Sequence, residues 1–282
     1  MGALRTLQPW TMVESIRQLS RRLALSPDEI SILGDIVSTA IPVRRRQDLV
    51  FEGRRSRSVY LVVDGLLIRY RIIRSGRRQV VNIVVPGDVT GAPSCFFDVA
   101  LYSVRTLTHA VVAEISLDTL SSLLDTHPPL VTKLFWLFSC DAALCAEHVV
   151  VLGCRSARER IAHFLLELLT RLREVGLADE NSFQMPFSQD VICDALGLSL
   201  PYVNRELRAL KQDGMVVTDN RKVVIRDVKK LSELADFQYR YLKPTLASEF
   251  FSSPRAPWQK VVGAHASNRG TTGSSSRAAA HR

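Results

Sequence analysis

Cysteine is scarce in this chain and is missing from its first third. Only 5 of the 282 residues are cysteines, and all of them follow residue 94. An odd, scattered set in a long chain is not typical of the disulfide framework of a small secreted protein. The thiols are therefore expected to be reduced: Cys95, Cys140, Cys145, Cys154 and Cys193.

The sequence also lacks a long uncharged apolar run. No stretch of about 18 apolar residues is free of charge, and the N-terminus has no apolar segment followed by a small-residue cleavage site. These absences predict a soluble, cytoplasmic chain with no membrane contact. With 282 residues, 46% of them apolar, the chain is long enough for two modest domains, each with its own core.

Acidic residues are absent from Phe250 to the end of the chain. The net charge is +9, and this tail alone contributes five basic residues, so overall basicity is weak evidence for nucleic acid binding. The tail is rich in Gly, Ser and Ala, and we expect it to be disordered from about residue 251. A solvated end is favoured over a segment that contacts DNA phosphates. The basic residues are Arg255, Lys260, Arg269, Arg277 and Arg282.

Catalytic and metal-binding constellations are missing as well. We find no pairing of nucleophile and base and no glycine-rich phosphate loop, so an enzyme is disfavoured. Cys145 and His148 lie three residues apart with Cys154 beyond, but a tetrahedral metal site needs three or four converging ligands. No metal is therefore predicted, while haem ligation through His109 or His127 stays open.

What is present from residue 41 to 117 is a period-two pattern broken by turn signals. Leu66, Ile68, Tyr70 and Ile72 share one strand face, and the residues between them share the other. Turns are indicated at Asp64-Gly65, Ser75-Gly76 and Pro86-Gly87-Asp88. Short strands at such regular spacing predict an antiparallel barrel or jelly roll.

A helix is predicted just before these strands. Ser26 is a plausible N-cap, Pro27 occupies the first helical position, and Glu29 stands at the capping-box spacing.

The order of four segments resembles a known family. The stretches "LVFEG", "YLVVDGLLIRY", "VVPGDVTG" and "VVAEIS" are similar to the cyclic-nucleotide-binding-type barrel of the Crp/Fnr family of bacterial transcription regulators. The resemblance covers about residues 20 to 238. It implies an α+β protein: an N-terminal barrel, a long dimerisation helix and a C-terminal winged helix-turn-helix.

The effector residues of that family are altered here. Members that bind cyclic AMP present a Gly-Glu pair to the ribose and an Arg-Ser pair to the cyclic phosphate, whereas this chain has Gly91-Ala92 and Ala100-Leu101. Without the acceptor and the cation, binding of cyclic AMP is not expected. Oxygen-sensing members hold an iron–sulfur cluster on cysteines near the N-terminus, and residues 1 to 94 contain none. That sensor mechanism is therefore excluded. Arg105, which lies nearby, is interpreted as an outward-facing strand residue.

A proline-free run from Leu130 to Gly153 predicts a long helix. Apolar residues recur along it at alternate spacings of four and three, which is a heptad seam. This seam can pack on the barrel of its own chain; the resemblance instead implies a two-fold dimer, which we favour. Cys145 is then a small buried apolar residue of the seam. The seam residues are Val131, Phe135, Phe138, Ala142, Cys145, Val149 and Leu152.

The segment from 188 to 214 has the pattern of a helix-turn-helix. Ser188 is predicted to cap a helix that ends at Leu196, and Gly197 to form the turn. Ser199 is predicted to cap a second helix that ends near Asp213. Four residues are spaced to face inward, Leu198, Val203, Leu207 and Leu210, and Cys193 fits where the helices approach closely.

The outward face of the second helix is the candidate reading surface. Arg205 matches the recognition arginine of the family and can contact guanine O6 and N7. Pro201 stands where the best-known members have a glutamate, so a different half-site is expected. The predicted base contacts are Arg205, Asn204, Tyr202, Pro201 and Leu200. The predicted phosphate contacts are Ser188, Gln189, Ser199, Arg208 and, on a wing of two strands around Asp219-Asn220, Arg221 and Lys222.

We therefore predict a homodimeric, sequence-specific transcription regulator that binds a near-palindromic operator in double-stranded DNA. The predicted divisions are an N-terminal extension (1–19), a sensor barrel (20–126), a dimerisation helix (127–153), a winged helix-turn-helix (154–238) and a C-terminal extension (239–282). The resemblance implies RNA polymerase as a further partner. One alternative is a barrel with no effector, controlled by abundance. Another is an effector-binding regulatory protein that acts through protein partners.

Overall fold

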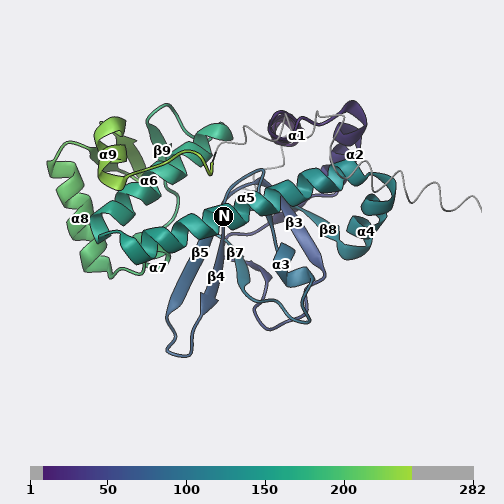
Figure 1. The fold of residues 1–282 in the computed structure, drawn as a ribbon, viewed down its shortest axis with the longest axis horizontal. Helices are drawn as coiled ribbons and strands as arrows, with labels where there is room; N and C mark the ends of the chain where they lie inside the picture. The colour runs from purple at the N-terminus through teal and green to yellow at the C-terminus, as the bar shows by residue number, and fades with distance from the viewer. Residues whose placement is uncertain (1–8, 243–282) are drawn as a thin grey trace, which may run out of the picture.

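The computed structural model describes residues 9–242 of the chain. The tail predicted to be disordered from about residue 251, with its five basic residues, lies outside the described residues. Figure 1 shows a β-barrel beneath the long helix α5 (Pro128–Cys154) and a helical C-terminal domain at the left-hand end of that helix.

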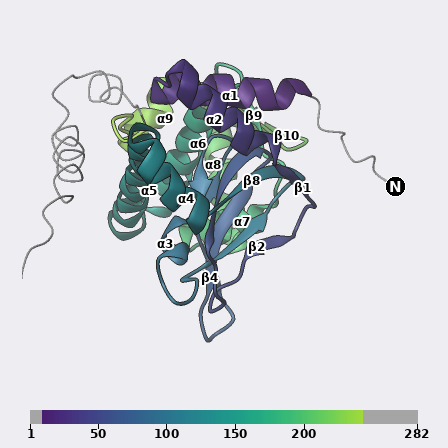
Figure 2. The ribbon, with the colours of Figure 1, turned by 90° about the vertical axis from the view of Figure 1, so that its right-hand side faces the viewer.

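Two N-terminal helices, α1 (Pro9–Leu23) and α2 (Pro27–Ser38), lie together on one side of the barrel (Figure 2). The predicted capping box is confirmed, because Ser26 accepts from the Glu29 amide and Glu29 accepts from the Ser26 amide. Ser15 on α1 donates to the Val63 carbonyl at 2.7 Å. Helix α1 therefore packs on the barrel, and it runs through the predicted boundary between residues 19 and 20.

The barrel consists of two four-stranded antiparallel sheets, which confirms the predicted jelly-roll type. One sheet has the order β1 (Ile41–Val43), β8 (Ala110–Ser116), β3 (Ser58–Asp64), β6 (Val89–Thr90). The other has the order β2 (Asp48–Val50), β7 (Ser103–Thr106), β4 (Leu67–Ile72), β5 (Arg78–Val84). A short helix, α3 (Ala92–Cys95), follows β6.

Gly65 closes the turn between β3 and β4, and no other residue fits there. Its φ of +87° lies in the left-handed region. A Cβ atom at this position would lie 2.4 Å from the His109 carbonyl oxygen. The predicted Asp64-Gly65 turn thus has a steric basis as well as a conformational one.

Three larger apolar cores, beside a small cluster at the start of α5, hold the described parts together. One fills the barrel interior and includes Val62, Leu67 and Val112. A second lies between the outer face of β3 and β8 and the N-terminal helices, with Leu19 and Leu33 as members. The third joins the outer face of β4 and β5 to the C-terminal domain. Both faces of β4 are therefore buried, except at its end, where Ile72 is exposed.

Two helices connect the barrel to the C-terminal domain. Helix α4 (Leu117–Thr126) is capped by Ser116, and α5 (Pro128–Cys154) extends one residue past the predicted stop at Gly153. By length and composition alone, α5 could cross a membrane. However, its charged residues pair with groups of the same chain; Lys133, for example, donates to Glu29 at 2.5 Å.

The C-terminal domain is a winged helix-turn-helix. Its helices are α6 (Ala157–Glu174), α7 (Gln189–Leu196), α8 (Leu200–Gln212) and α9 (Val228–Ala235). Its sheet has the order β10 (Val216–Asp219), β11 (Lys222–Ile225), β9 (Ser182–Gln184). The sequence predicted β10 and β11 as a two-stranded wing and missed β9, which adds a third strand.

Candidate DNA-binding surface

The helix-turn-helix is built as the apolar pattern requires. Gly197 ends α7 in the left-handed conformation, with φ of 65°, and redirects the chain into α8. Val203 and Leu210 on α8 are fully buried, while Leu198 and Leu207 are partly buried against the same core. Cys193 is also partly buried there. The inward residues fix the orientation of α8, and its opposite face is left to solvent.

Serine side chains do not cap these two helices as predicted. Ser188 and Ser199 have the extended backbone of N-cap residues, but neither hydroxyl accepts a cap hydrogen bond. The Ser188 hydroxyl instead donates to Asp190 at 3.1 Å. At Ser199, the proline at position 201 removes one of the amides that a cap would bind.

The outer face of α8 carries the predicted base-contacting residues. Leu200, Pro201, Tyr202 and Arg205 are exposed, and Asn204 is half-buried. The guanidinium carbon of Arg205 lies 3.9 Å from the centroid of the Tyr202 ring. Two guanidinium nitrogens of Arg205 also donate to the same oxygen of Glu206, at 3.1 and 3.0 Å. Tyr202 and Glu206 thus hold this arginine in a defined position.

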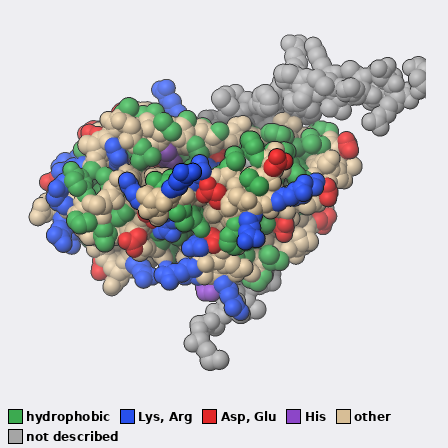
Figure 3. Space-filling model, turned by 90° about the horizontal axis from the view of Figure 1, so that it is seen from below, with side chains coloured by type: hydrophobic (Ala, Val, Ile, Leu, Met, Phe, Trp, Pro, Cys, Tyr) green, Lys and Arg blue, Asp and Glu red, His purple; other side chains and the backbone are tan. Residues whose placement is uncertain are grey.

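The predicted phosphate-contacting residues surround this face. Ser188, Ser199 and Arg208 are exposed and Gln189 is half-buried. At the wing, Asn220 and Arg221 both have positive φ, which forms a tight turn that leaves Arg221 and Lys222 exposed. Lys222 lies 3.6 Å from Asp179. Figure 3 shows Lys and Arg side chains gathered at the end of the molecule that carries α8 in Figure 1.

The predicted dimer seam on α5 is only partly available. Phe135 and Val149 are 50% and 71% exposed, and Ala142 is exposed as well. Phe138 and Leu152 are half-buried. Val150, which the heptad pattern omitted, adds further exposed apolar surface.

Two seam assignments need correction. Val131 is buried with Leu123 and Leu130 of its own chain, because the start of α5 is covered by α4 and α2. Val131 therefore cannot pair with a second subunit. Cys145 is half-buried, and its sulfur accepts from the Arg69 guanidinium at 2.9 Å, so it is more than a small apolar residue.

The altered effector residues are small or apolar in the structure. Gly91 has φ of +88°, and a Cβ atom there would lie 3.0 Å from the Ser58 carbonyl oxygen. Ala92 and Ala100 are buried apolar side chains, and Leu101 is exposed. These four positions offer no cation to a phosphate and no carboxylate to a ribose.

Arg105, near those positions, supplies no cation to them. Its guanidinium donates to Asp48 at 2.9 and 2.5 Å, so it is committed to an ion pair on the neighbouring strand.

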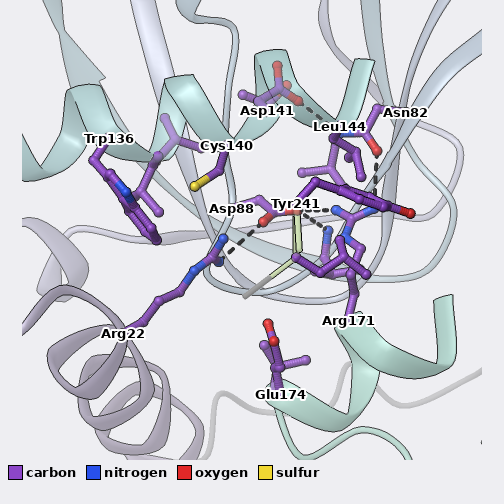
Figure 4. Close-up of a pocket in the computed structure, with 17 residues that line it drawn as sticks. Arg22, Asn82, Asp88, Trp136, Cys140, Asp141, Leu144, Arg171, Glu174 and Tyr241 are labelled. Carbon is purple, nitrogen blue, oxygen red and sulfur yellow. Dashed lines mark hydrogen bonds and ion pairs between the residues drawn. The ribbon is translucent and has the colours of Figure 1, made fainter. Parts of the chain in front are cut away.

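A buried polar network, which no sequence pattern indicated, connects the barrel to α5 and α6. Asp141 on α5 accepts from Arg69 at 2.6 Å and from Asn82 at 2.9 Å. The Asn82 oxygen accepts from Arg171 on α6 at 3.2 Å, and Arg171 also donates to Asp88 at 2.6 Å. Figure 4 shows the part of this network around Asn82, Asp88, Asp141 and Arg171. Its bonded pairs join residues up to 89 positions apart, so no local pattern marks them.

A histidine extends the network toward the C-terminal domain. His148 on α5 lies 2.9 Å from Glu167 on α6, and its other ring nitrogen lies 3.1 Å from the Val81 carbonyl oxygen. Burial opposes protonation of this imidazole, but the Glu167 carboxylate outweighs it and raises the pKa of His148. The pKa of Glu167 is lowered to about 2: burial alone would raise it, but His148 and Arg171 prevail.

The members of this network are paired with one another. Between residues 9 and 242, no group of three or more His, Cys, Asp or Glu side chains is placed to hold a metal ion.

The comparisons with known proteins agree with this geometry. Residues 41–127 match the cyclic nucleotide-binding domain, and residues 159–234 match the Crp-like helix-turn-helix domain. The chain is 26% identical to the regulatory protein HlyX of Actinobacillus pleuropneumoniae over 77% of its length and 90% of that protein. It is 27% identical to the transcriptional activator protein anr of Pseudomonas aeruginosa over 79% of its length and 91% of that protein.

A solved structure supports the same assignment. FixK2 from Bradyrhizobium japonicum is 28% identical, with a TM-score of 0.63 over 70% of this chain and 96% of that one. The two matched domains, their order and the shared fold establish that the chain belongs to the Crp/Fnr family of bacterial transcription regulators.

Proposed function

We propose that this regulator reads a near-palindromic operator as a homodimer, with one α8 in each of two successive major grooves. Half-sites about 34 Å apart, one helical turn, follow from that symmetry. The observation that carries the proposal is the outward face of α8, where Arg205 is exposed and held by Tyr202 and Glu206.

Direct readout is assigned to the first turns of α8. Arg205 reads a guanine, while Asn204, Tyr202 and Leu200 contact base edges or a thymine methyl. Pro201 brings no carboxylate, so its contribution is apolar and steric. The contacts that set register on the phosphates are assigned to Ser188, Gln189, Ser199, Arg208, Arg221 and Lys222.

Dimerisation is assigned to the exposed part of α5. Phe135, Ala142 and Val149 form an apolar stripe that continues into the half-buried Phe138 and Leu152. Pairing of this stripe with its copy brings two DNA-binding domains to one side of a two-fold axis. The same pairing accounts for the apolar length of α5 without a membrane. The domain division follows: sensor barrel to residue 126, dimerisation helix 127–153, winged helix-turn-helix 154–238.

The cellular setting follows from this role. A regulator that binds DNA in a bacterium works in the cytoplasm, by binding and not by catalysis, and contacts RNA polymerase at its promoters. Neither a cyclic nucleotide nor an iron–sulfur cluster of the N-terminal-cysteine type is assigned to it. The cassette positions lack the needed groups, and residues 1 to 94 lack cysteine.

Selection of bound duplexes from a random pool tests the readout. Wild type should yield a palindrome, and Arg205→Ala should lose preference at one symmetric pair of positions, a loss of about 1–3 kcal/mol in discrimination. Lys229→Ala is the matched control, since Lys229 is an exposed cation on α9, away from the reading face. An unchanged motif with Arg205→Ala would remove Arg205 from the readout.

A further inference from the structure

An apolar and basic surface lies at the lower end of the barrel, on the side away from α1 and α2 (Figure 1). The Gly53 amide donates to the Ala100 carbonyl at 2.8 Å, and Arg71 donates to Glu52 at 2.8 Å. These bonds join three chain segments into one surface, which we call the loop-tip surface. Its segments are residues 51–55 after β2, 71–77 at the end of the β4–β5 hairpin, and 97–101 after α3.

Large apolar side chains are left in solvent on every segment of this surface. The exposed Phe96 is not counted with them, because it lies beside Phe138 of α5, next to the proposed dimer stripe. Single exposed apolar residues are ordinary, but a contiguous group rimmed by polar residues marks a site for a protein or a membrane. The side chains are between 41% and 55% exposed: Phe51, Ile72, Ile73, Phe97, Val99 and Leu101.

The charges among these apolar side chains are mainly positive. The loop-tip surface has only two carboxylates, Glu52 and Asp98, and Glu52 is already paired with Arg71. The other exposed arginines have no ion pair among the described residues. Figure 3 views the molecule from this side and shows basic side chains among hydrophobic ones. The exposed arginines are Arg54, Arg55, Arg71, Arg74 and Arg77.

The combination of apolar tips and arginines distinguishes between classes of partner. Nucleic-acid interfaces are polar and basic, so they do not account for six exposed aliphatic and phenyl side chains. A stable protein interface packs about 800 Å² per partner as closely as a protein interior. Here the apolar side chains instead belong to three loops that project from the barrel (Figure 1). Apolar side chains at the headgroup boundary, flanked by cations, are the usual means of binding to an anionic lipid surface.

We propose that the loop-tip surface binds the anionic phospholipid surface of a membrane. Ile72, Ile73 and Phe97 enter the headgroup region, and the arginines pair with lipid phosphates through two hydrogen bonds each. The sequence predicted no membrane contact because it lacks an uncharged apolar run, but a peripheral contact needs none. The proposal goes beyond the proposed function and does not depend on it.

Flotation of the full-length protein with lipid vesicles tests the proposal. Vesicles of phosphatidylcholine alone are compared with vesicles in which about a third of the lipid is phosphatidylglycerol. Each arginine near an anionic surface contributes about fivefold to binding, so wild type should bind the anionic vesicles about tenfold or more tightly. Equal binding to the two kinds of vesicle would overturn the proposal.

Two double variants separate the charged part of the contact from the apolar part. Arg74→Glu with Arg77→Glu reverses two charges, and Ile72→Ser with Ile73→Ser removes two apolar side chains. Each should weaken binding to the anionic vesicles about tenfold or more. Circular dichroism checks that both fold. If the isoleucine variant does not, Phe97→Ser, on a different segment, takes its place.

Matched changes elsewhere control for the general basicity of the chain. Lys229→Glu with Lys230→Glu reverses two exposed charges on α9, and Leu124→Ser removes an exposed apolar side chain of α4. Both should bind anionic vesicles within about twofold of wild type. A loss as large as that of the hairpin variants would place the lipid contact elsewhere and overturn the assignment.

Insertion of the apolar side chains is measured with Phe97→Trp. Lipids brominated on their acyl chains should quench the emission of this variant more than that of wild type. Equal quenching would mean that the protein adsorbs by charge alone, and the apolar part of the proposal would fail.

Duplex selection with the same proteins separates this proposal from the proposed function. The hairpin variants should select the wild-type duplexes, because the reading face of α8 lies at another end of the molecule (Figure 1). If they lose duplex binding and keep vesicle binding, the surface binds nucleic acid and the membrane proposal is wrong. If wild type binds anionic vesicles and selects no duplex, the proposed function alone fails.

Discussion

The guanidinium of Arg205 lies over the ring of Tyr202, 3.9 Å from its centroid, one helical turn apart on the exposed face of α8. Glu206 accepts two hydrogen bonds from the same guanidinium. The arginine is therefore held on the outer face of α8 with part of its conformational freedom already lost. An aromatic ring in this position stabilises a cation by about 0.5–1 kcal/mol at an exposed site.

Replacement of Tyr202 by alanine should loosen Arg205 and reduce operator affinity by about threefold to tenfold, in line with the loss of one cation–π contact and its apolar area. Tyr202→Phe keeps the ring and should keep most of the affinity. Fluorescence anisotropy with the selected duplex measures both. Equal losses in the two variants would mean that the hydroxyl, and not the ring, is the important group.

Replacement of Val149 by aspartate should shift the protein toward monomer. Val149 is 71% exposed in one chain and lies on the proposed dimer stripe, where a charge would be buried without a partner. Leu124→Asp is the matched control, since Leu124 is an exposed apolar residue of the neighbouring helix α4. Sedimentation equilibrium reports the masses. A dimer that tolerates Val149→Asp as well as Leu124→Asp would not be held by α5.

The ion pair between His148 and Glu167 should make stability depend on pH. The folded-state pKa of His148 is raised, so its contribution is fully present below the unfolded pKa of about 6.5 and is lost as pH rises through the folded pKa. His163 and Arg171 face the same carboxylate, and His163 opposes the trend because its own pKa is lowered. Comparison with a variant isolates His148 from these neighbours.

Urea unfolding of wild type and His148→Gln at pH 5.5 and pH 8.5 provides that comparison. The difference in free energy of unfolding between the two proteins should be larger at pH 5.5. An equal or larger difference at pH 8.5 would show that the imidazole contributes in its neutral form.

Removal of one partner from the buried pair of Lys133 and Glu29 should be strongly destabilising. The two side chains are 7% and 9% exposed, and the ammonium lies 2.5 Å from the carboxylate. Lys133→Met leaves a buried carboxylate without its partner. Such a change typically lowers the free energy of unfolding by about 3–5 kcal/mol. The double variant Lys133→Met with Glu29→Gln should recover much of the lost stability. A single variant as stable as wild type would mean that water reaches Glu29.

Local features of this fold could be predicted from the sequence because their causes are local. The capping box at Ser26 and Glu29 depends on a spacing of three residues, and the buried residues Val203 and Leu210 of α8 follow from helical periodicity. Strand β9 was missed because it has only three residues and is defined by pairing with β11, about forty residues later. Its own sequence carries too short a pattern.

The errors on α5 have a different cause. A heptad pattern shows that a stripe is buried but not which partner buries it, and Val131 is covered by its own chain. Likewise, Arg69 and Asp141 are 72 residues apart, and a charged residue on a strand gives no sign that it points into a barrel. The packing of α5 against the barrel brings the two residues together.

The hairpin of β4 and β5 packs its outer face into the same apolar core as α6 and α7, with Arg78 bonded to Asp194 and Gln79 to the Ala195 carbonyl. The barrel and the C-terminal domain are consequently not independent units joined by a linker. A fragment that ends with α5 would expose Ile68, Ile83 and the other barrel residues of this core to water, which favours aggregation over independent folding. The C-terminal domain could be exchanged between related proteins only together with the surface of the hairpin on which it packs.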